Sequence, residues 1–506
     1  YRRLRGLVTW CVERRKTVLL TTFLLFVLSV VGMAKLVEKQ FFPSSDRPEL
    51  LIDIYLPEGT SIDVTDKLTQ RIEKLVAEQP EVRSLSSYVG QGAPRFFMAL
   101  NPELPNPAFA KVVAITGGRE ERDALQNRLQ ALIDQGEFAE ARVRVHPLLY
   151  GPPVIWPVTF RVMGEDPVML RQIAGQVREV MEQHPQTIQP HLEWGERAPI
   201  IKLDLNLTRL EQIGLTPLQL QQQLQFLLGG VSVTELRHQT RTVQLMARST
   251  DSERLNLASL GSLQIKNRYG DSVPLEHVAK LQVEYEDPVL KRRNRTPYLS
   301  VNSEIKPGAQ PPDVTMQIWP QLQQINQNLP LGYRIEIGGS VEESGKAQGS
   351  IRAMMPVMVV LMLTLIMLMM RSFSGMFMVI LTAPLGLIGA VMALLLFSQP
   401  FGFVATLGLI GLAGILMRNT LILVGQIDDN RRQGMTDYEA VIDATVRRAR
   451  PVILTALAAV LAFIPLTTST FWGPLAYVLI GGITMGTLLT LLFLPAMYSA
   501  WFKVKA

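Results

Sequence analysis

The chain has 506 residues, of which 48% are hydrophobic and 19% are charged, a balance too apolar for an ordinary soluble protein of this size. The net charge of +6 reflects basic residues beside apolar runs, so it requires no nucleic-acid partner. The single cysteine, Cys11, excludes a disulfide framework.

Uncharged residues gather in four runs that are long enough to cross a bilayer. One span needs about 20 apolar residues, so the two shorter runs predict one helix each. The two longer runs are broken by SQP and by TTSTFWGP, and each predicts two helices. The predicted spans are 16–36, 352–371, 376–397, 402–425, 451–467 and 475–501.

Lysines and arginines give the orientation, because they concentrate on the cytoplasmic side of a membrane. The residues before the first span are rich in arginine, and so is the connection 426–450. The breaks near residues 400 and 470 contain no basic residue. Both termini are therefore predicted in the cytoplasm, with the block 38–350 on the outer side.

The outer block repeats a strand–helix–strand pattern four times. Its paired strands are 49–56 with 83–90, 109–116 with 141–148, 156–164 with 199–207, and 297–305 with 332–339. Each pair encloses an amphipathic helix, and four such units predict two ferredoxin-like α/β sandwiches. A strand-rich insert with an expected hairpin at 269–271 is a candidate docking surface.

No catalytic motif is found. The five histidines are scattered without ligand spacing, so no metal site is predicted. The stretch GGSVEESGKA (338–347) has the wrong glycine spacing for a phosphate loop, and Ala347 replaces the residue that would hold magnesium. It is interpreted as a linker between a strand and a membrane helix. We predict that the chain is not an enzyme, has no cofactor, and drives any transport with an ion gradient.

Arg418 is the one charged residue between 372 and 427. A charge at mid-span costs about 2.5 to 3.5 kcal/mol on insertion scales and usually faces a protein interior. Gly411 and Gly414 share its helical face and are small enough for another helix to approach. Arg418 lies roughly 10 Å from the inner end of its span, so snorkelling to the headgroups stays an alternative to burial against a partner helix.

The next span adds Arg448 and Thr455, which are seven residues apart and so nearly on one helical face. Arg448 alone could be a positive-inside anchor, and the Thr455 hydroxyl could bond the carbonyl four residues earlier. No Asp or Glu lies in the six predicted spans, and arginine does not release its proton. The carboxylate that balances Arg418 must come from another segment or another chain.

Three stretches of the sequence resemble a known family. They are FFPSSDRPELLIDIYLPEGTSI (41–62), GILMRNTLILV (414–424) and RRARPVILTALAAVLAFIPL (447–466). They resemble the C-terminal half of a resistance-nodulation-division (RND) permease of the hydrophobe/amphiphile efflux type, over essentially the whole chain. The resemblance implies an α-helical membrane bundle of six transmembrane helices and a large periplasmic α+β region. The full protomer would have twelve spans in two similar halves and would form a homotrimer.

The resemblance also implies a proton-coupling site. In this family the first half supplies two aspartates, and the second half supplies a cation on one span and an Arg and a Thr on the next. By position these are Arg418, with Asn419 beside it, then Arg448 and Thr455. The family's cation is commonly Lys. Arg418 keeps the charge without the possibility of deprotonation, which favours an electrostatic role.

The resemblance further divides the chain into parts. It implies an N-terminus with a first membrane helix (1–37), a porter subdomain (38–150), a second porter subdomain (151–206 with 292–345), a docking insert (207–291) and a five-helix bundle (346–506). A mobile loop between the family's substrate pockets corresponds to VGQGAPRFFMAL (89–100). Its candidate substrate-binding residues are Gly90, Gly92, Phe96 and Phe97. The alternative is that either phenylalanine belongs to the core of the following strand.

The predicted function is proton-driven export of hydrophobic or amphiphilic compounds, such as drugs, detergents or biocides, from the inner membrane of a Gram-negative bacterium. The implied partners are the N-terminal half of the permease, a periplasmic adaptor protein, an outer-membrane channel and membrane lipids. Two alternatives are a heavy-metal RND exporter and a protein-export accessory subunit of the same superfamily. A heavy-metal exporter would have a series of methionines or acidic residues along its spans. The protein-export subunit would have an acidic residue within the membrane. A tethered binding protein without transport would leave Arg418 unexplained.

Overall fold

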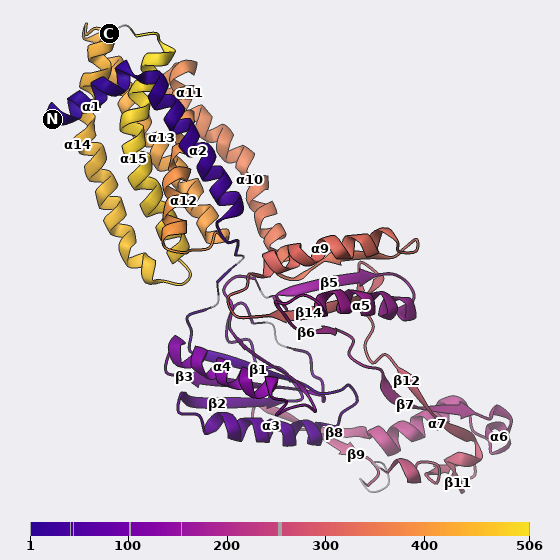
Figure 1. Cartoon of the computed structure of the whole chain (residues 1–506). Helices are drawn as coiled ribbons and strands as arrows, with labels where there is room; N and C mark the ends of the chain where they lie inside the picture. The colour runs from indigo at the N-terminus through magenta and orange to yellow at the C-terminus, as the bar shows by residue number, and fades with distance from the viewer. Residues whose placement is uncertain are drawn as a thin grey trace. The chain divides into compact units, whose positions relative to one another are not determined.

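The computed structural model describes residues 2–504 except 41, 44, 101–102, 153 and 251–255. The chain separates into two compact units. The first comprises 1–56, 60–195 and 290–506, and the second comprises 57–59 and 196–289. Figure 1 shows that the first unit contains the membrane helices and two helix-covered sheets, while the second is a smaller α/β unit.

Six helical stretches among the described residues are long and apolar enough to cross a membrane. They are α2 (Arg15–Lys35), α10 (Gly339–Met370), α11 with α12 (Phe373–Thr382 and Gly386–Leu396), α13 (Phe403–Arg432), α14 (Asp437–Phe463, with a 3-10 turn to Thr468) and α15 (Gly473–Trp501). Each overlaps one predicted span. Before them lies a shorter helix, α1 (Arg2–Glu13).

The interpretation of 338–347 as a linker is wrong, because α10 starts at Gly339 and continues into the membrane span. The chain turns from strand to helix at Gly339, which has a φ of +63° and whose missing Cβ would lie 3.0 Å from the Pro157 carbonyl oxygen. Only glycine adopts this conformation at such a close approach without strain. The outer region and the membrane are thus joined by one uninterrupted helix.

Glycines let the membrane helices pack backbone to backbone. A Cβ on Gly389 of α12 would lie 2.1 Å from the carbonyl oxygen of Gly481 on α15. A Cβ on Gly482 would lie 2.1 Å from Leu412 Cδ2 on α13. Helices in lipid have no hydrophobic driving force for association. The close van der Waals packing that small residues allow takes its place at these crossings. The small residues allow α15 to pack on α12, α13 and α14, as Figure 1 shows.

The first sheet has the strand order β2-β3-β1-β4, with antiparallel neighbours. Its strands are β1 (Glu49–Tyr55), β2 (Val82–Val89), β3 (Phe109–Thr116) and β4 (Arg142–Pro147), and its helices are α3 (Ile62–Ala77) and α4 (Arg119–Asp134). Alternate residues of a strand point to opposite faces. Leu50, Ile52 and Ile54 lie in the core that the helices share, so Asp53 and Tyr55 belong to the opposite face.

The second sheet is built around β14, which pairs with β5 on one side and with β6 and β13 on the other, while β15 pairs with β5. Its elements are β5 (Val158–Met163), α5 (Pro167–Glu182), β6 (Thr187–Leu192), β13 (Lys291–Arg293), β14 (Thr296–Ile305), α9 (Pro311–Gln327) and β15 (Arg334–Ile337). The prediction that 199–207 returns into this sheet is wrong. The returning strand is β6. Its sequence, TIQPHL, is hard to identify as a strand because it contains a proline, which edge strands tolerate.

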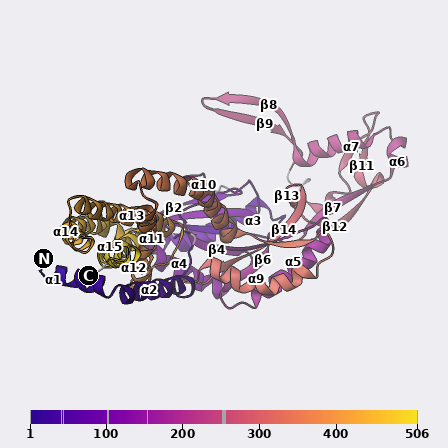
Figure 2. The ribbon, with the colours of Figure 1, turned by 90° about the horizontal axis from the view of Figure 1, so that it is seen from above.

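The second unit contains the segment that was assigned to that sheet. Its strand β7 (Ala198–Leu205) pairs with β12 (Ala279–Glu286). The other α-helices and strands among its described residues are α6 (Leu207–Gln212), α7 (Pro217–Leu224), β8 (Val231–His238), β9 (Arg241–Ala247), β10 (Gln264–Lys266) and β11 (Ser272–Pro274). Within this unit β8 and β9 extend from α7 as a two-stranded ribbon (Figure 2). The hairpin predicted at 269–271 is confirmed, since β10 pairs with β11 around it.

Replacing Gly389 with alanine tests the close contact of α12 and α15. We expect Gly389→Ala to lower the Tm of the purified protein, because overpacking costs about 1–3 kcal/mol. Gly349→Ala is the matched control, since a Cβ there would meet nothing within 4 Å and alanine favours the helix. Equal Tm values for the two variants would show that the crossing is looser than described.

Candidate functional sites in the membrane helices and between the two sheets

Arg418 lies on an exposed face of α13. Gly411 and Gly414 share this face, and a Cβ at either position would meet nothing within 4 Å. No ion pair joins Arg418 to any described residue of this chain. The burial against a partner helix that the sequence suggested is therefore not provided by these six spans, and the face is open to lipid or to another polypeptide.

Asn419 lies on the other side of α13, where it is 4% exposed. Its neighbour Thr420 is fully buried, and the Thr420 and Thr382 hydroxyls form a hydrogen bond of 2.7 Å between α13 and α11. Asn419 and Arg418 thus face different surroundings although they are adjacent in sequence. Asn419 belongs to the packed interior of the bundle, whereas Arg418 does not.

Arg448 and Thr455 form no hydrogen bond with Arg418 in the described part of the chain. The Arg448 Nε donates to the Gln426 side-chain oxygen at 2.9 Å, which links α14 to α13 near their polar ends. Thr455 is exposed, and its hydroxyl donates to the Val452 carbonyl at 3.0 Å, one residue nearer than the partner considered from sequence. Among the described residues, no hydrogen bond or ion pair joins any two of the four predicted coupling residues, Arg418, Asn419, Arg448 and Thr455.

The residues of the predicted substrate loop differ in backbone conformation and in exposure. Gly90 has a φ of +76°, which glycine adopts without strain, and the position of a Cβ on Gly92 is already filled by Glu103. Phe97 packs on the core cluster that contains Leu51, whereas Phe96 is 44% exposed. Phe97 is therefore partly buried against that cluster, and Phe96 is the more exposed of the two phenylalanines.

A row of buried charges crosses the first sheet and was not singled out from the sequence. Asp53 on β1 is paired in register with Lys111 on β3 and with Arg144 on β4. Lys111 Nζ lies 3.1 Å from one Asp53 oxygen, and His146 Nε2 lies 3.0 Å from the other. The side chains of Asp53 and Lys111 are each 2% exposed. Buried charges of this kind persist only when they are paired.

Arg144 extends the row from the first sheet to the second. Its Nε donates to Glu304 Oε1 on β14 at 2.6 Å, so the ion pair joins the two sheets. The Arg144 guanidinium lies 4.2 Å from the centroid of the Trp156 ring, and His191 on β6 meets the same ring edge-on at 4.5 Å. We call Asp53, Lys111, Arg144, His146, Trp156, His191 and Glu304 the inter-sheet cluster.

The ionisation of this cluster follows from its burial and its charges. Burial tends to raise the pKa of Asp53, but His146, Lys111 and Arg144 outweigh it and hold that pKa below its usual range. Burial, and after it the charge of Arg142, lowers the pKa of His191 to about 3. His191 is therefore neutral at physiological pH, with its Nδ1–H donating to the Gln189 carbonyl at 2.9 Å.

The sequence contained a signal for this cluster. Asp53 interrupts the apolar strand ELLIDIY, Lys111 interrupts FAKVVAIT, and Arg142, Arg144 and His146 alternate along the fourth strand. Because residues two apart point to one face of a strand, such charges gather on the face away from the helices. Chemically, the cluster offers carboxylates, an imidazole and an aromatic ring for a cation, provided that Arg144 or Lys111 moves away.

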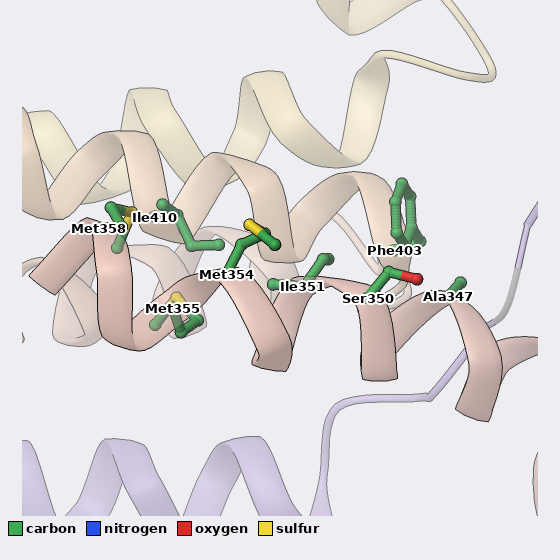
Figure 3. A pocket seen from close by; sticks show the side chains of 8 residues that line it. All are labelled: Ala347, Ser350, Ile351, Met354, Met355, Met358, Phe403 and Ile410. Atoms are coloured by element: carbon green, nitrogen blue, oxygen red, sulfur yellow. The ribbon is translucent and has the colours of Figure 1, made fainter.

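A second feature is an apolar groove between α10 and α13, with a volume of about 420 Å³. Figure 3 shows Met354 and Met358 on the side of α10 that faces Ile410 of α13. Ser350 is the polar side chain among the labelled residues that line it. Met354 is 66% exposed, as expected for a side chain that faces lipid. The groove can hold an apolar group, and its thioethers are soft ligands.

The low pKa of His191 predicts a pH dependence of stability. The unfolded chain binds a proton to this residue near pH 6.5, whereas the folded chain does so only at about 3. Between these values the unfolded state holds more protons, so stability falls as the pH falls, by up to about 1.4 kcal/mol per pH unit. His191→Gln should flatten the decrease of Tm between about pH 6 and 4. His238→Gln, at an exposed position, is the control and should leave the slope unchanged.

Comparison with known proteins gives the family. A family model described as the AcrB/AcrD/AcrF family matches residues 1–501. The cobalt-zinc-cadmium resistance protein of Cupriavidus metallidurans is 25% identical over an alignment of 508 positions, which covers 95% of this chain and 47% of that protein. The nickel and cobalt resistance protein of the same organism is 25% identical, covering 91% of this chain and 44% of that protein. Protein HelA of Legionella pneumophila is 26% identical, and the match covers 96% of this chain and 48% of that protein.

The fold agrees with solved structures. Two crystal forms of a heavy metal efflux pump match with TM-scores of 0.78 and 0.80 at 20% sequence identity, covering 99% of this chain and 52% and 51% of those chains. The chain therefore spans about half the length of the relatives that it matches. With a family match over nearly all its residues, this chain belongs to the AcrB/AcrD/AcrF family of RND permeases.

Proposed function

We propose that this chain is half of an inner-membrane RND efflux transporter and that the transporter exports metal cations. Two of the three relatives named above are metal-resistance proteins, which favours the metal alternative over the predicted export of hydrophobic or amphiphilic compounds. The observation in the structure that supports a cationic substrate is the inter-sheet cluster, where Asp53, Glu304 and His146 are gathered between two sheets. Carboxylate and imidazole groups suit divalent transition metals.

The cluster as it stands is not a metal site. Among the described residues no group of three or more His, Cys, Asp or Glu is arranged to hold a metal ion. Asp53 is neutralised by Lys111 and Arg144, and Glu304 by Arg144. A metal cation would therefore bind only in a conformation in which Arg144 leaves the carboxylates. We infer that the two sheets separate at this ion pair when substrate enters.

Export of amphiphilic compounds is the second candidate. The apolar groove between α10 and α13 and the exposed Phe96 favour it, because both present apolar surface that a metal ion would not use. The buried carboxylates would then serve only to hold the two sheets together. The two candidates differ in whether Asp53 contacts the substrate.

The energy source proposed is the proton gradient, with Arg418 in an electrostatic role. Its face of α13 is uncovered by this chain, and an unpaired cation in a membrane is costly. We propose that a helix from the other half of the transporter covers this face and supplies the carboxylates that titrate. The adaptor protein, the outer-membrane channel and the homotrimer follow from the family and belong to the same proposal.

The substrate class is tested by resistance assays in a host that lacks its own efflux systems. The complete transporter should raise the tolerated concentration of Co²⁺, Zn²⁺ or Ni²⁺. Asp53→Asn should abolish this effect, because it removes a carboxylate from the cluster. Glu78→Gln, an exposed acid on the same subdomain, is the control. Protection against cationic dyes and detergents without protection against metals would establish the second candidate instead.

The role of Arg418 is tested by charge removal. Arg418→Ala should reduce export to the level of the empty vector, and Arg418→Lys should retain part of it, because only the latter keeps the charge. Arg450→Ala, another exposed arginine at the polar end of α14, should have little effect. Size-exclusion chromatography would check that each variant assembles. Normal export by Arg418→Ala would support snorkelling to the headgroups.

A further inference from the structure

The helix α1 has an apolar side that this bundle buries and a basic side that it leaves open. Val8, Cys11 and Val12 are buried, and Val12 packs in a cluster with residues of α14 and α15. The arginines Arg2, Arg3, Arg5 and Arg14 are all exposed. By contrast, the next arginine, Arg15, donates to the carbonyls of Ser499 and Val504 at 2.8 Å each. The helix is therefore fixed to the bundle while these four arginines stay exposed.

The open side has a specific pattern. Arg3, Leu7, Trp10 and Arg14 follow one another at intervals of four, three and four residues, which places them on one face. Leu7 and Trp10 are each 46% exposed, and the Arg14 guanidinium lies 6.0 Å from the Trp10 ring centroid. A tryptophan flanked by arginines is the side-chain combination that favours the membrane–water interface. We call these four residues the α1 stripe.

The position of α1 restricts what can cover the stripe. α1 ends at Glu13, and the membrane helix α2 begins at Arg15. A helix this close to the start of a span lies at the level of the headgroups. Figure 1 shows α1 turned away from the direction of α2 and lying at the end of the bundle where the C-terminus also lies. Glu13 is the one acid among residues 2–16, so the surface is strongly positive.

We propose that the α1 stripe binds the headgroups of anionic phospholipids on the cytoplasmic side of the membrane. The arginines supply the charge attraction, and Leu7 and Trp10 supply the apolar contact just below the headgroups. Each arginine near an anionic surface contributes about fivefold in binding. This inference rests on the proposed membrane topology and is independent of the exported substrate.

Brominated lipids test the proposal, because bromine quenches tryptophan fluorescence on contact. The complete transporter is reconstituted into phosphatidylcholine bilayers that contain equal mole fractions of either brominated phosphatidylglycerol or brominated phosphatidylcholine. The signal of Trp10 is the difference between each protein and its Trp10→Phe variant. We expect the phosphatidylglycerol probe to quench Trp10 severalfold more than the phosphatidylcholine probe.

Matched variants separate lipid recognition from simple membrane contact. Arg3→Gln with Arg14→Gln should bring the ratio of the two quenching efficiencies close to one, while Arg83→Gln with Arg178→Gln, both in the outer region, should leave it unchanged. Equal quenching of the unaltered protein by both probes would overturn the proposal in favour of general membrane contact. Absence of quenching by either probe would overturn it in favour of a protein partner on this face. Circular dichroism of each variant checks that the helices are retained.

Discussion

A charged group in a low-dielectric environment needs a counter-charge. The structure depends on this requirement in two places. In the inter-sheet cluster the requirement is met within the chain, since Asp53 has Lys111, Arg144 and His146 as partners. In the membrane it is not met, because Arg418 lies on an open face. Asp53 is therefore paired within this chain, whereas no described residue forms an ion pair with Arg418.

Ion pairs of Glu342 connect the membrane helix α10 to the second outer sheet. Glu342 in the first turns of α10 accepts from Arg161 on β5 at 3.0 Å and from Arg293 on β13 at 2.6 Å. Because α10 is one continuous helix, Glu342 links the membrane span to β5 and β13 of the second sheet. Arg144 and Glu304 then join the second sheet to the first. These contacts link α10 to the second sheet and the second sheet to the first.

Much of this organisation could be read from the sequence, for identifiable reasons. The membrane helices and the strands β1, β3, β5 and β14 have long apolar patterns that few other structures could accommodate. The strand β6 was missed because its proline and polar residues suit an edge, where periodicity is weak. The start of α10 was missed because glycines suggested a linker. The exposure of Arg418 depends on what other polypeptide packs on α13, so no pattern within this chain could determine it.

Arg144 is held by three partners in the inter-sheet cluster. Its guanidinium has an ion pair with Glu304, a second carboxylate nearby in Asp53, and the face of Trp156 at 4.2 Å. Removing one partner from such a buried arrangement costs about 3–5 kcal/mol. A divalent cation brings twice the charge of a guanidinium to the same carboxylates and can offset that cost, whereas an uncharged amphiphile cannot. The proposal of metal export thus rests on two separate observations, the paired charges of the inter-sheet cluster and the metal-resistance relatives.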